Sequence, residues 1–496
     1  MTYTRPTTNP PNRHSSRRER AGRVARPPWL RGLSRAGVLV SIAFNAGCAG
    51  ASAREAEWPP RAKEWYDRAS ASFRTGDIDD AEYAASRALA LAKGRPEVRV
   101  LAGRVALSRL EFDRVIELLE GIESADAWAL KGRAHWYAGR LQRCADELEQ
   151  LLADPEVRDP WAVDVARLAR QGTGRRPFSM SGGLLAVAEM PRNPASALLV
   201  PLELNGEPAL GLIATGTAEA VVDAGSTGEP SWVSLRFGER VEVRDVPALA
   251  KDLSGISRQL NAPVKILIGV NLLRHLRPTV DFAGGQFVVR TFEPPPPPQA
   301  TTLHLNYIRG GGMLMRGAFG AEENAPAASL LVDTSMSFPL ALDDAGWRKA
   351  GIDPTKLDSV PNVAKLRQGI LPLLRLGAFE LPSVPGVLGA PIDEIERGLD
   401  VEVDGLVGSG LLAAFRVTLV DGGRTLWLED VPPPLPEAAS EPDFSLQPPA
   451  GVDDSSEEGS ASDAAPAAAP AKPNVAPAKP APAKPSNGPA QPGARP

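Results

Sequence analysis

Two segments that could carry acid–base chemistry lie 119 residues apart, and each follows a short apolar run. Residues 209–213 and 328–332 are mostly Ala, Leu, Ile and Val, a pattern typical of buried strands. The turns that follow contain Ala214, Thr215 and Gly216 in the first copy, and Asp333, Thr334 and Ser335 in the second. A carboxylate such as that of Asp333 can move a proton to or from a substrate, and such assistance contributes roughly 10²–10⁴ in rate.

A second motif also occurs twice, at an offset of 139 residues. Residues 266–269 (Ile-Leu-Ile-Gly) correspond to residues 405–408 (Gly-Leu-Val-Gly), and a pair of glycines follows each copy. The same offset relates Leu272 to Leu411, Leu273 to Leu412, Arg277 to Arg416 and Thr279 to Thr418. Short apolar runs between Gly and Pro turns predict β-strands. We therefore expect two related all-β lobes, residues 178–293 and 300–431, joined by a rigid proline linker at residues 294–299.

This doubled order of parts resembles the retropepsin-like and pepsin-related aspartic peptidases. In that family each lobe has an apolar strand, then Asp-Thr/Ser-Gly, and later an apolar-apolar-Gly motif that packs beneath the active site. The resemblance implies that Asp333, Thr334 and Ser335 form the second catalytic loop, and that Ala214, Thr215 and Gly216 are the equivalents of the first. The alternative is an unrelated pair of β-sandwiches with chance similarity.

The family's chemistry requires two facing carboxylates that share one proton, because two like charges at that distance cannot both ionise. The methyl group of Ala214 can neither accept nor donate a proton, and Ser335 replaces the glycine of the second loop. Loss of half of the pair should raise the barrier by at least ~3–5 kcal/mol. We therefore expect an aspartic-peptidase-type fold with a degenerate, inactive site, and the sequence leaves open whether any peptidase activity survives.

Two alternatives would restore a carboxylate pair. In the first, the dyad residue is Asp223, which also follows apolar residues; its counterpart, Asp344, is two residues out of step with the main offset. In the second, two copies of the second lobe associate and bring two Asp333 carboxylates together. Pairing of two lobes on one chain is favoured over association of two chains, because the linker raises their effective concentration.

Residues 60–172 are rich in Ala, Leu, Arg and Glu and predict an all-α repeat region with a period of 34. Small residues such as Ala69, Gly103 and Gly132 would let antiparallel helices approach, and Gly76 and Gly139 suit the turns. These stretches resemble tetratricopeptide repeats, which implies a curved stack that binds a peptide or a partner protein. A helical spacer without a ligand is the alternative, and the pattern assigns no binding residues.

Residues 1–47 carry nine Arg and one Glu, and residues 36–47 contain no charge, which predicts a signal peptide. Cys48 follows Ala46 and Gly47, and this resembles a bacterial lipoprotein signal, which implies lipidation at Cys48 and a place in the cell envelope. Residues 48–59 then form a linker. Cleavage after Ala53, which would leave a soluble exported protein, and an uncleaved anchor are the alternatives.

Residues 432–496 are rich in Pro, Ala and Lys and predict a disordered tail, because they cannot bury enough apolar surface to offset their ordering entropy. We expect a passive spacer, with weak contact to cell-wall polymers or a partner as the alternative. The fold class is therefore multidomain: a helical-repeat domain, two aspartic-peptidase-like lobes and the tail.

Composition excludes several other classes. Two Cys and four His leave no disulfide framework and no Cys-rich zinc module, and we expect neither a metal nor a cofactor. Outside the basic leader the chain is acidic, which disfavours nucleic-acid binding. His135 is expected to be a packing residue in a helix, and His275 to lie at the surface or in the core rather than to bind a ligand. Cys144 is expected to be a small buried residue, and residues 309–312 to form a hairpin turn.

Three functions follow from these patterns. The first is an exported, lipid-anchored envelope protein whose degenerate module binds a peptide or a partner protein, with membrane contact only through the anchor. The second is an active aspartic endopeptidase that uses Asp333 in a homodimer or in a non-standard dyad. The third is a structural envelope scaffold. The sequence leaves the oligomeric state open.

Overall fold

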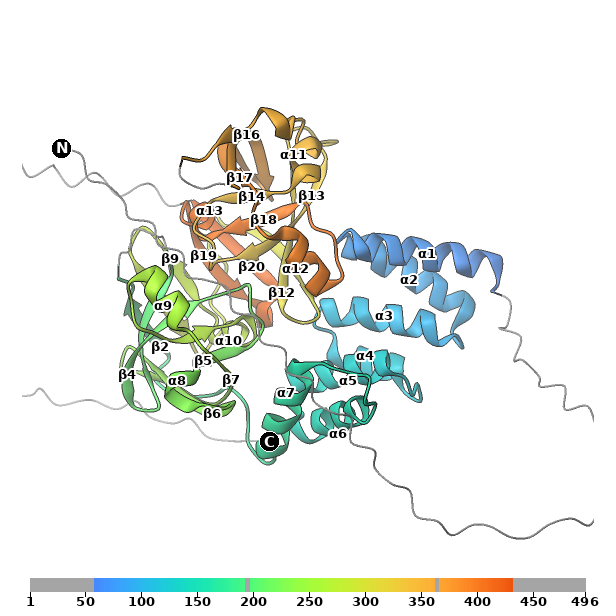
Figure 1. Ribbon diagram of the computed structural model, residues 1–496, viewed down its shortest axis with the longest axis horizontal. Helices are drawn as coiled ribbons and strands as arrows, with labels where there is room; N and C mark the ends of the chain where they lie inside the picture. The colour runs from blue at the N-terminus through green and yellow to red at the C-terminus, as the bar shows by residue number, and fades with distance from the viewer. Residues whose placement is uncertain (1–57, 192–196, 362–364, 431–496) are drawn as a thin grey trace, which may run out of the picture. The chain divides into compact units, whose positions relative to one another are not determined.

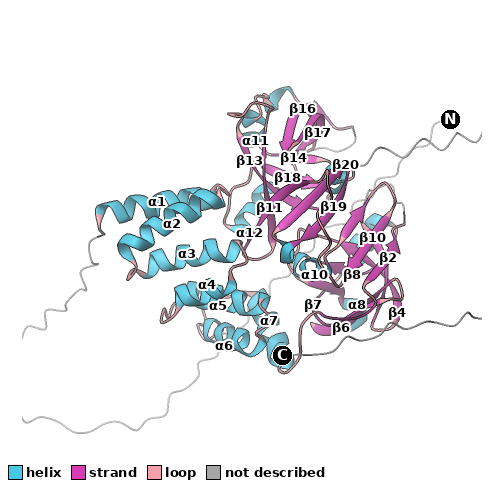
Figure 2. Cartoon of the chain, turned by 180° about the vertical axis from the view of Figure 1, so that it is seen from behind, coloured by secondary structure: helices cyan, strands magenta, loops and turns pink. Residues whose placement is uncertain are grey.

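The computed structural model describes residues 58–191, 197–361 and 365–430. The predicted signal peptide, Cys48 and the predicted tail lie outside the described residues. The chain divides into two units, residues 1–433 and 434–496, and everything described below belongs to the first. Figures 1 and 2 show a helical part followed by a β-rich part. No helix within the described ranges is both long and apolar enough to cross a membrane.

Seven helices occupy residues 60–171, as the repeat pattern predicts. They are α1 (Pro60–Arg74), α2 (Ile78–Ala92), α3 (Pro96–Ser108), α4 (Phe112–Leu119), α5 (Ala125–Tyr137), α6 (Leu141–Leu152) and α7 (Pro160–Gln171). The side chains of Asp77, Ser124 and Asp159 cap helix N-termini by accepting backbone N–H bonds. A Cβ at Gly132 would lie only 2.5 Å from Leu148, so glycine is what lets α5 and α6 approach.

The strands form two sheets. One has, in spatial order, β1 (Ser179–Gly182), β7 (Val241–Lys251), β5 (Ala220–Asp223), β8 (Val264–Ile268), β4 (Glu207–Ile213), β3 (Leu199–Leu204) and β6 (Ser231–Phe237). The other has β15 (Asp358–Ser359), β16 (Arg367–Leu376), β17 (Phe379–Leu388), β14 (Leu340–Leu342), β18 (Gly405–Gly408), β13 (Ala327–Asp333), β12 (Gly312–Ala318), β11 (Thr301–Ile308), β20 (Thr425–Asp430), β19 (Phe415–Val420), β9 (Thr279–Asp281), β10 (Gln286–Arg290) and β2 (Leu185–Glu189).

The two repeated motifs pair in the same way in both halves. Strand β4 runs parallel to β8, and β5 pairs with β8 on its other side in the antiparallel sense. In the second half β13 runs parallel to β18, and β14 is the antiparallel neighbour. The strand that precedes each candidate loop therefore lies beside the strand that ends in the apolar-Gly motif.

The two halves share a sheet at their junction. Strands β9, β10 and β2 come from the first half, but they belong to the larger sheet, where β9 pairs with β19 of the second half. Edge strands expose unpaired backbone groups, and this shared sheet satisfies them across the junction. The linker at residues 294–299 therefore joins two halves that share one sheet.

The helices pack on both halves. Buried side chains of α5–α7 share one core cluster with Leu199, Leu212 and Ala214 of the first half. Those of α1–α3 share another with Leu314, Leu331 and Leu406 of the second half. At the second contact, the Ser329 hydroxyl donates to the Thr75 carbonyl at 2.9 Å. Both halves of the β region are thus fixed to the same helical stack.

Candidate functional site

Two threonines join the candidate loops by a reciprocal set of hydrogen bonds. The Thr215 hydroxyl donates to the Val332 carbonyl at 2.8 Å, and the Thr334 hydroxyl donates to the Ile213 carbonyl at 2.9 Å. Each hydroxyl also accepts the backbone N–H of the opposite threonine, at 3.1 and 3.0 Å. Both side chains are buried, so the bonds hold the two loops together in a dry setting.

A second pair of equivalent residues marks the same symmetry. The hydroxyls of Thr279 and Thr418, which the 139-residue offset relates, lie 2.8 Å apart where β9 meets β19. Residues that meet their own counterparts lie on a local two-fold axis. This axis therefore passes between Thr215 and Thr334 and between Thr279 and Thr418, and it relates the two halves.

The Asp333 carboxylate reaches the opposite loop. It is buried, and its Oδ1 accepts hydrogen bonds from the Ser335 amide at 3.0 Å and from the Ser335 hydroxyl at 2.6 Å. A Cβ at Gly216 would lie 2.6 Å from the Asp333 carboxyl carbon. The Asp333 carboxylate therefore occupies the space that a side chain at position 216 would need.

Ala214 holds the position that corresponds to Asp333 in the first half. Its side chain is buried, and its amide donates to the Ile268 carbonyl at 3.1 Å. The structure thus brings all six residues that the sequence singled out to one place: Ala214, Thr215, Gly216, Asp333, Thr334 and Ser335. One loop supplies a carboxylate and the other supplies a methyl group.

Asp223, the alternative dyad residue, lies elsewhere. It ends β5, and its carboxylate accepts bonds from the Leu253 amide and the Lys265 ammonium group, both at 3.3 Å. Its counterpart Asp344 begins the short helix α11 (Asp344–Lys349). Neither residue takes part in the threonine junction. Pairing of two second halves would also have to displace Thr215, which already occupies the face of Thr334 that a second copy would need.

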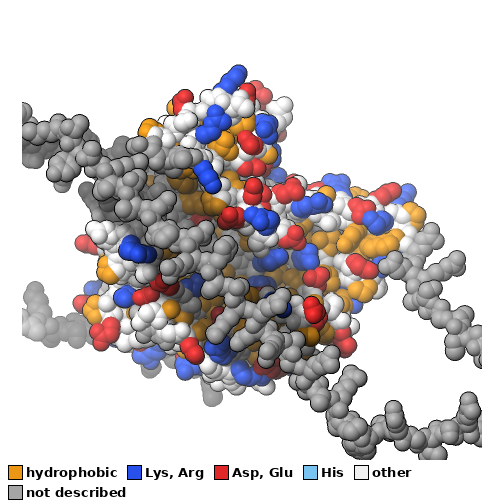
Figure 3. Space-filling model, in the orientation of Figure 1, with side chains coloured by type: hydrophobic (Ala, Val, Ile, Leu, Met, Phe, Trp, Pro, Cys, Tyr) orange, Lys and Arg blue, Asp and Glu red, His pale blue; other side chains and the backbone are white. Residues whose placement is uncertain are grey.

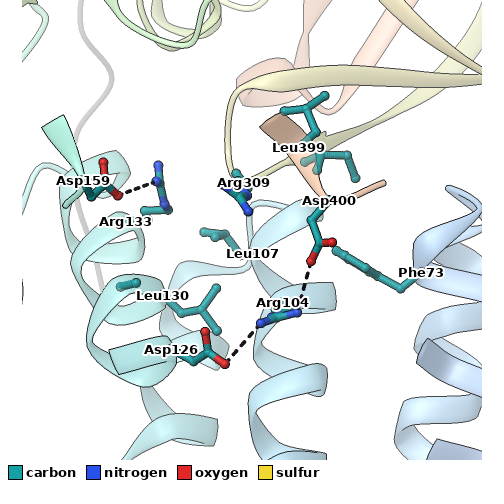
Figure 4. A pocket seen from close by; sticks show the side chains of 12 residues that line it. Phe73, Arg104, Leu107, Asp126, Leu130, Arg133, Asp159, Arg309, Leu399 and Asp400 are labelled. Atoms are coloured by element: carbon teal, nitrogen blue, oxygen red, sulfur yellow. Dashed lines mark hydrogen bonds and ion pairs between the residues drawn. The ribbon is translucent and has the colours of Figure 1, made fainter. Parts of the chain in front are cut away.

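Asp333 and Gly216 line a cavity of about 680 Å³ whose other walls come from distant parts of the chain. Helix α5 contributes Arg133 and Tyr137, and the β11–β12 turn contributes Arg309. A smaller cavity of about 170 Å³ shares Arg133 and Arg309 and continues along the helices (Figure 4). The candidate loops and the helical stack therefore border two neighbouring open cavities that share lining residues.

Glu219 is a functional candidate that the sequence analysis missed. This buried carboxylate, four residues after Thr215, accepts hydrogen bonds from the side chains of Trp136, Tyr137, Trp161 and Asn271, at 3.1, 3.2, 3.2 and 3.4 Å. Three of these donors belong to α5 and α7, so Glu219 fastens the helical stack to the loop that carries Gly216. A lone acidic residue among apolar ones at positions 218–222 was the only available signal.

Tyr137 is the centre of a contact among all three parts of the molecule. A Cβ at Gly310 would lie 2.1 Å from its ring, and one at Gly311 would lie 2.3 Å from the Ala218 side chain. Burial, and then the charge of Glu219, raises the pKa of Tyr137, so its hydroxyl stays protonated and donates. Strands β11 and β12 pair at Ile308 and Gly312, which confirms the hairpin turn that residues 309–312 predict.

His135, His275 and Cys144 pack inside the structure. Burial lowers the pKa of His135 to about 4 and that of His275 to about 3, and the His275 ring stacks on Phe178 with centroids 4.3 Å apart. Cys144 is a free, buried thiol, and its burial raises its pKa. Within the described ranges, no group of three or more His, Cys, Asp or Glu side chains could hold a metal ion.

Comparison with known proteins gives only distant similarities. No family model matches the chain, and no curated protein matches it. Among solved structures, a retropepsin-like aspartic protease from Rickettsia conorii is 22% identical over 26% of this chain and 88% of its own, with a TM-score of 0.20. Basic 7S globulin from soybean is 9% identical over 51% of this chain and 95% of its own, with a TM-score of 0.34.

The helical part has a separate neighbour. The first TPR of Spaghetti (RPAP3), solved bound to the HSP90 peptide SRMEEVD, is 14% identical over 23% of this chain and 94% of its own, with a TM-score of 0.20. At these scores the likenesses are weak ones of fold.

Proposed function

We propose that this chain is an exported, lipid-anchored envelope protein whose aspartic-peptidase-like module has lost catalysis and binds an extended peptide or a segment of a partner protein. The observation that supports the loss is Ala214, which directly precedes Thr215 in the first loop as Asp333 precedes Thr334 in the second, where the two threonines pair. A single carboxylate cannot act both as base toward water and as acid toward a carbonyl oxygen in the manner of a shared-proton pair.

The cavity that Asp333 lines supports a role in binding an extended peptide. The cavity has walls from both β halves and from α5 and the start of α7, and it continues along helices α3 and α5. A tetratricopeptide-like stack offers such a groove, and an aspartic-peptidase-like cleft can hold a substrate backbone after a carboxylate is lost. Both features lead to one ligand class, an extended polypeptide.

The catalytic state is tested with an unstructured protein such as reduced, alkylated casein, incubated with the purified chain between pH 3 and 7. We expect no cleavage, and we expect the Asp333→Asn variant to bind a labelled peptide pool as well as the wild type does. Cleavage that pepstatin blocks and Asp333→Asn abolishes would instead establish the peptidase. Absence of any peptide binding would favour the structural scaffold.

The lipid anchor has an independent test. We expect metabolic labelling with radioactive palmitate in a bacterial host to mark the wild-type chain and to be lost in Cys48→Ser. Cys144→Ser is the matched control, because that thiol is buried in the fold and should leave labelling unchanged. Labelling that survives in Cys48→Ser would contradict the anchor.

A further inference from the structure

Three guanidinium groups line the same cavity as Asp333, and they differ in whether an acidic side chain pairs with them. Arg133 stacks on the Trp161 ring, 3.7 Å from its centroid, and lies 3.7 Å from the Asp159 carboxylate. Within the described ranges, Arg158 and Arg309 form no ion pair within 4.0 Å. Both are exposed at the rim of the cavity, and although Asp400 and Asp159 lie near enough to favour the charged form of Arg309, neither pairs with it directly.

Arg309 is held in place by its backbone. It forms the β11–β12 turn with a positive φ of 52°, its carbonyl accepts the Tyr137 hydroxyl at 3.5 Å, and Gly310 beside it is packed on the Tyr137 ring. Figure 4 shows its side chain between Arg133 and Asp400, with no dashed line to either. Desolvation, and then the charge of Arg133, lowers the pKa of Arg309, and the charges of Asp400 and Asp159 oppose this shift in part. An anion bound directly to Arg309 would further stabilise its charged form.

The neighbouring charges limit what that anion can be. Asp333 and Asp159 line the same cavity, so a densely charged group such as a phosphate dianion would be repelled from part of the space. A carboxylate carries one charge, and its two oxygens match the planar fork of a guanidinium. The cavity therefore suits a singly charged, planar anion.

We propose that the cavity binds a carboxylate of an extended peptide, with Arg309 as the bidentate donor and Arg158 as a second positive charge. The inference rests on the proposed function, since it names the chemistry of the peptide. The carboxylate can come from an acidic side chain or from a chain end, and both sources offer the same group to Arg309.

Three labelled octapeptides test the proposal by fluorescence anisotropy with the full chain. The first contains three Glu and ends in an amide; the second replaces the three Glu with Gln and keeps the amide; the third has the same Gln and a free terminal carboxylate. We expect the first or the third to bind at least about tenfold more tightly than the second. Tighter binding of the first peptide would identify an acidic side chain as the source of the carboxylate, and tighter binding of the third would identify the chain end. The advantage should shrink as salt rises, because screening weakens charge pairing.

Variants locate the site on the chain. Arg309→Gln should weaken binding of the preferred acidic peptide roughly 10- to 100-fold, and Arg158→Ala should weaken it less, because a hydrogen bond to a charged group contributes more than charge proximity alone. Arg348→Ala is the matched control: this exposed arginine on α11 does not line the cavity. Thermal melting of each variant verifies that it folds. If Arg309→Gln fails to fold, Arg158→Ala still tests the site.

The possible results separate this inference from the proposed function. Equal binding of all three peptides would overturn the carboxylate site and leave peptide binding intact. An acidic preference that Arg309→Gln and Arg158→Ala leave unchanged would also overturn it. If no peptide binds at all, both the inference and the proposed function fail.

Discussion

The two candidate loops share one backbone arrangement and differ in the chemistry that they carry. Each loop donates a threonine hydroxyl to a carbonyl of the other half and accepts the opposite threonine's N–H. In the second loop this frame presents a carboxylate, and in the first it presents a methyl group. The threonine bonds join the loops although only one of them carries a carboxylate, so the junction does not depend on a second acidic side chain.

Removal of a threonine hydroxyl should have the largest effect on the stability of the junction. Thr215→Val leaves the Val332 carbonyl and the Thr334 amide without their partner in a buried setting, and each unsatisfied group costs about 1–3 kcal/mol. We expect Thr215→Val and the reciprocal Thr334→Val each to lower the free energy of unfolding by about 2–6 kcal/mol, measured by urea denaturation. Thr302→Val, at an exposed position on β11, should change it by less than about 0.5 kcal/mol. Very unequal losses in the two threonine variants would contradict the symmetry of the junction.

A carboxyl group introduced into the first loop would make the two loops chemically alike, and its effect on stability should be the next largest. Ala214→Asp places a second carboxyl group opposite Asp333, and the like charge should raise the pKa of the introduced group by about 1–3 units. A raised folded-state pKa means that the folded chain holds a proton which the unfolded chain has released, so stability falls as pH rises. Ala214→Asn is the control of equal size without charge. We expect the Asp variant to be about 1–4 kcal/mol less stable than the Asn variant at pH 7.

That difference should disappear below about pH 3, which lies under the ordinary Asp pKa of about 3.9, because the carboxyl group is then protonated in both the folded and the unfolded state. Urea denaturation at about pH 3 and at about pH 7 measures it. A difference between the two variants that is the same at about pH 3 and about pH 7 would show that the introduced group does not face Asp333.

A smaller effect is expected at the third position of the loops. Gly216 leaves room for the Asp333 carboxyl group, whereas Ser335 carries a side chain at the equivalent position. Gly216→Ala should force the carboxylate to shift and cost about 1–3 kcal/mol of unfolding free energy. Gly255→Ala is the matched control, since a Cβ at Gly255 meets no atom within 4 Å. Equal stability of the two variants would place the Asp333 carboxylate away from the first loop.

The smallest expected change concerns the Ser335 hydroxyl. Ser335→Ala removes one of its two bonds to Asp333 and keeps the backbone bond, and the side chain is exposed, so we expect a loss of no more than about 1 kcal/mol. Ser337→Ala, at another exposed serine of the same turn, should have no measurable effect. A loss of several kcal/mol in Ser335→Ala would mean that this hydroxyl holds the loop together in the way that the threonines do.

Local patterns predicted much of this structure. The apolar runs before Ala214 and Asp333, the apolar-Gly motifs and the repeat period in the helices each depend on neighbouring residues, and a period or an offset reveals them. The offsets of 119 and 139 residues also paired the positions that meet at the junction, Thr215 with Thr334 and Thr279 with Thr418.

What the sequence did not predict depends on contacts between distant segments. The pairing of β9 with β19, the burial of Glu219 by Trp136, Tyr137 and Trp161, and the position of Arg309 beside Arg133 each join residues from different parts of the chain. Isolated Glu and Arg residues are common on surfaces, so their types carried no signal until the fold placed them.

The attachment of one helical stack to both β halves has a consequence for what can reach Asp333. Thr75 and Ser329 fix the stack to the second half, and Glu219 fixes it to the first, so the two walls cannot separate widely without breaking buried bonds. Asp333 therefore lies in a cleft whose width is set by the fold, because the helical wall is tied to both β walls.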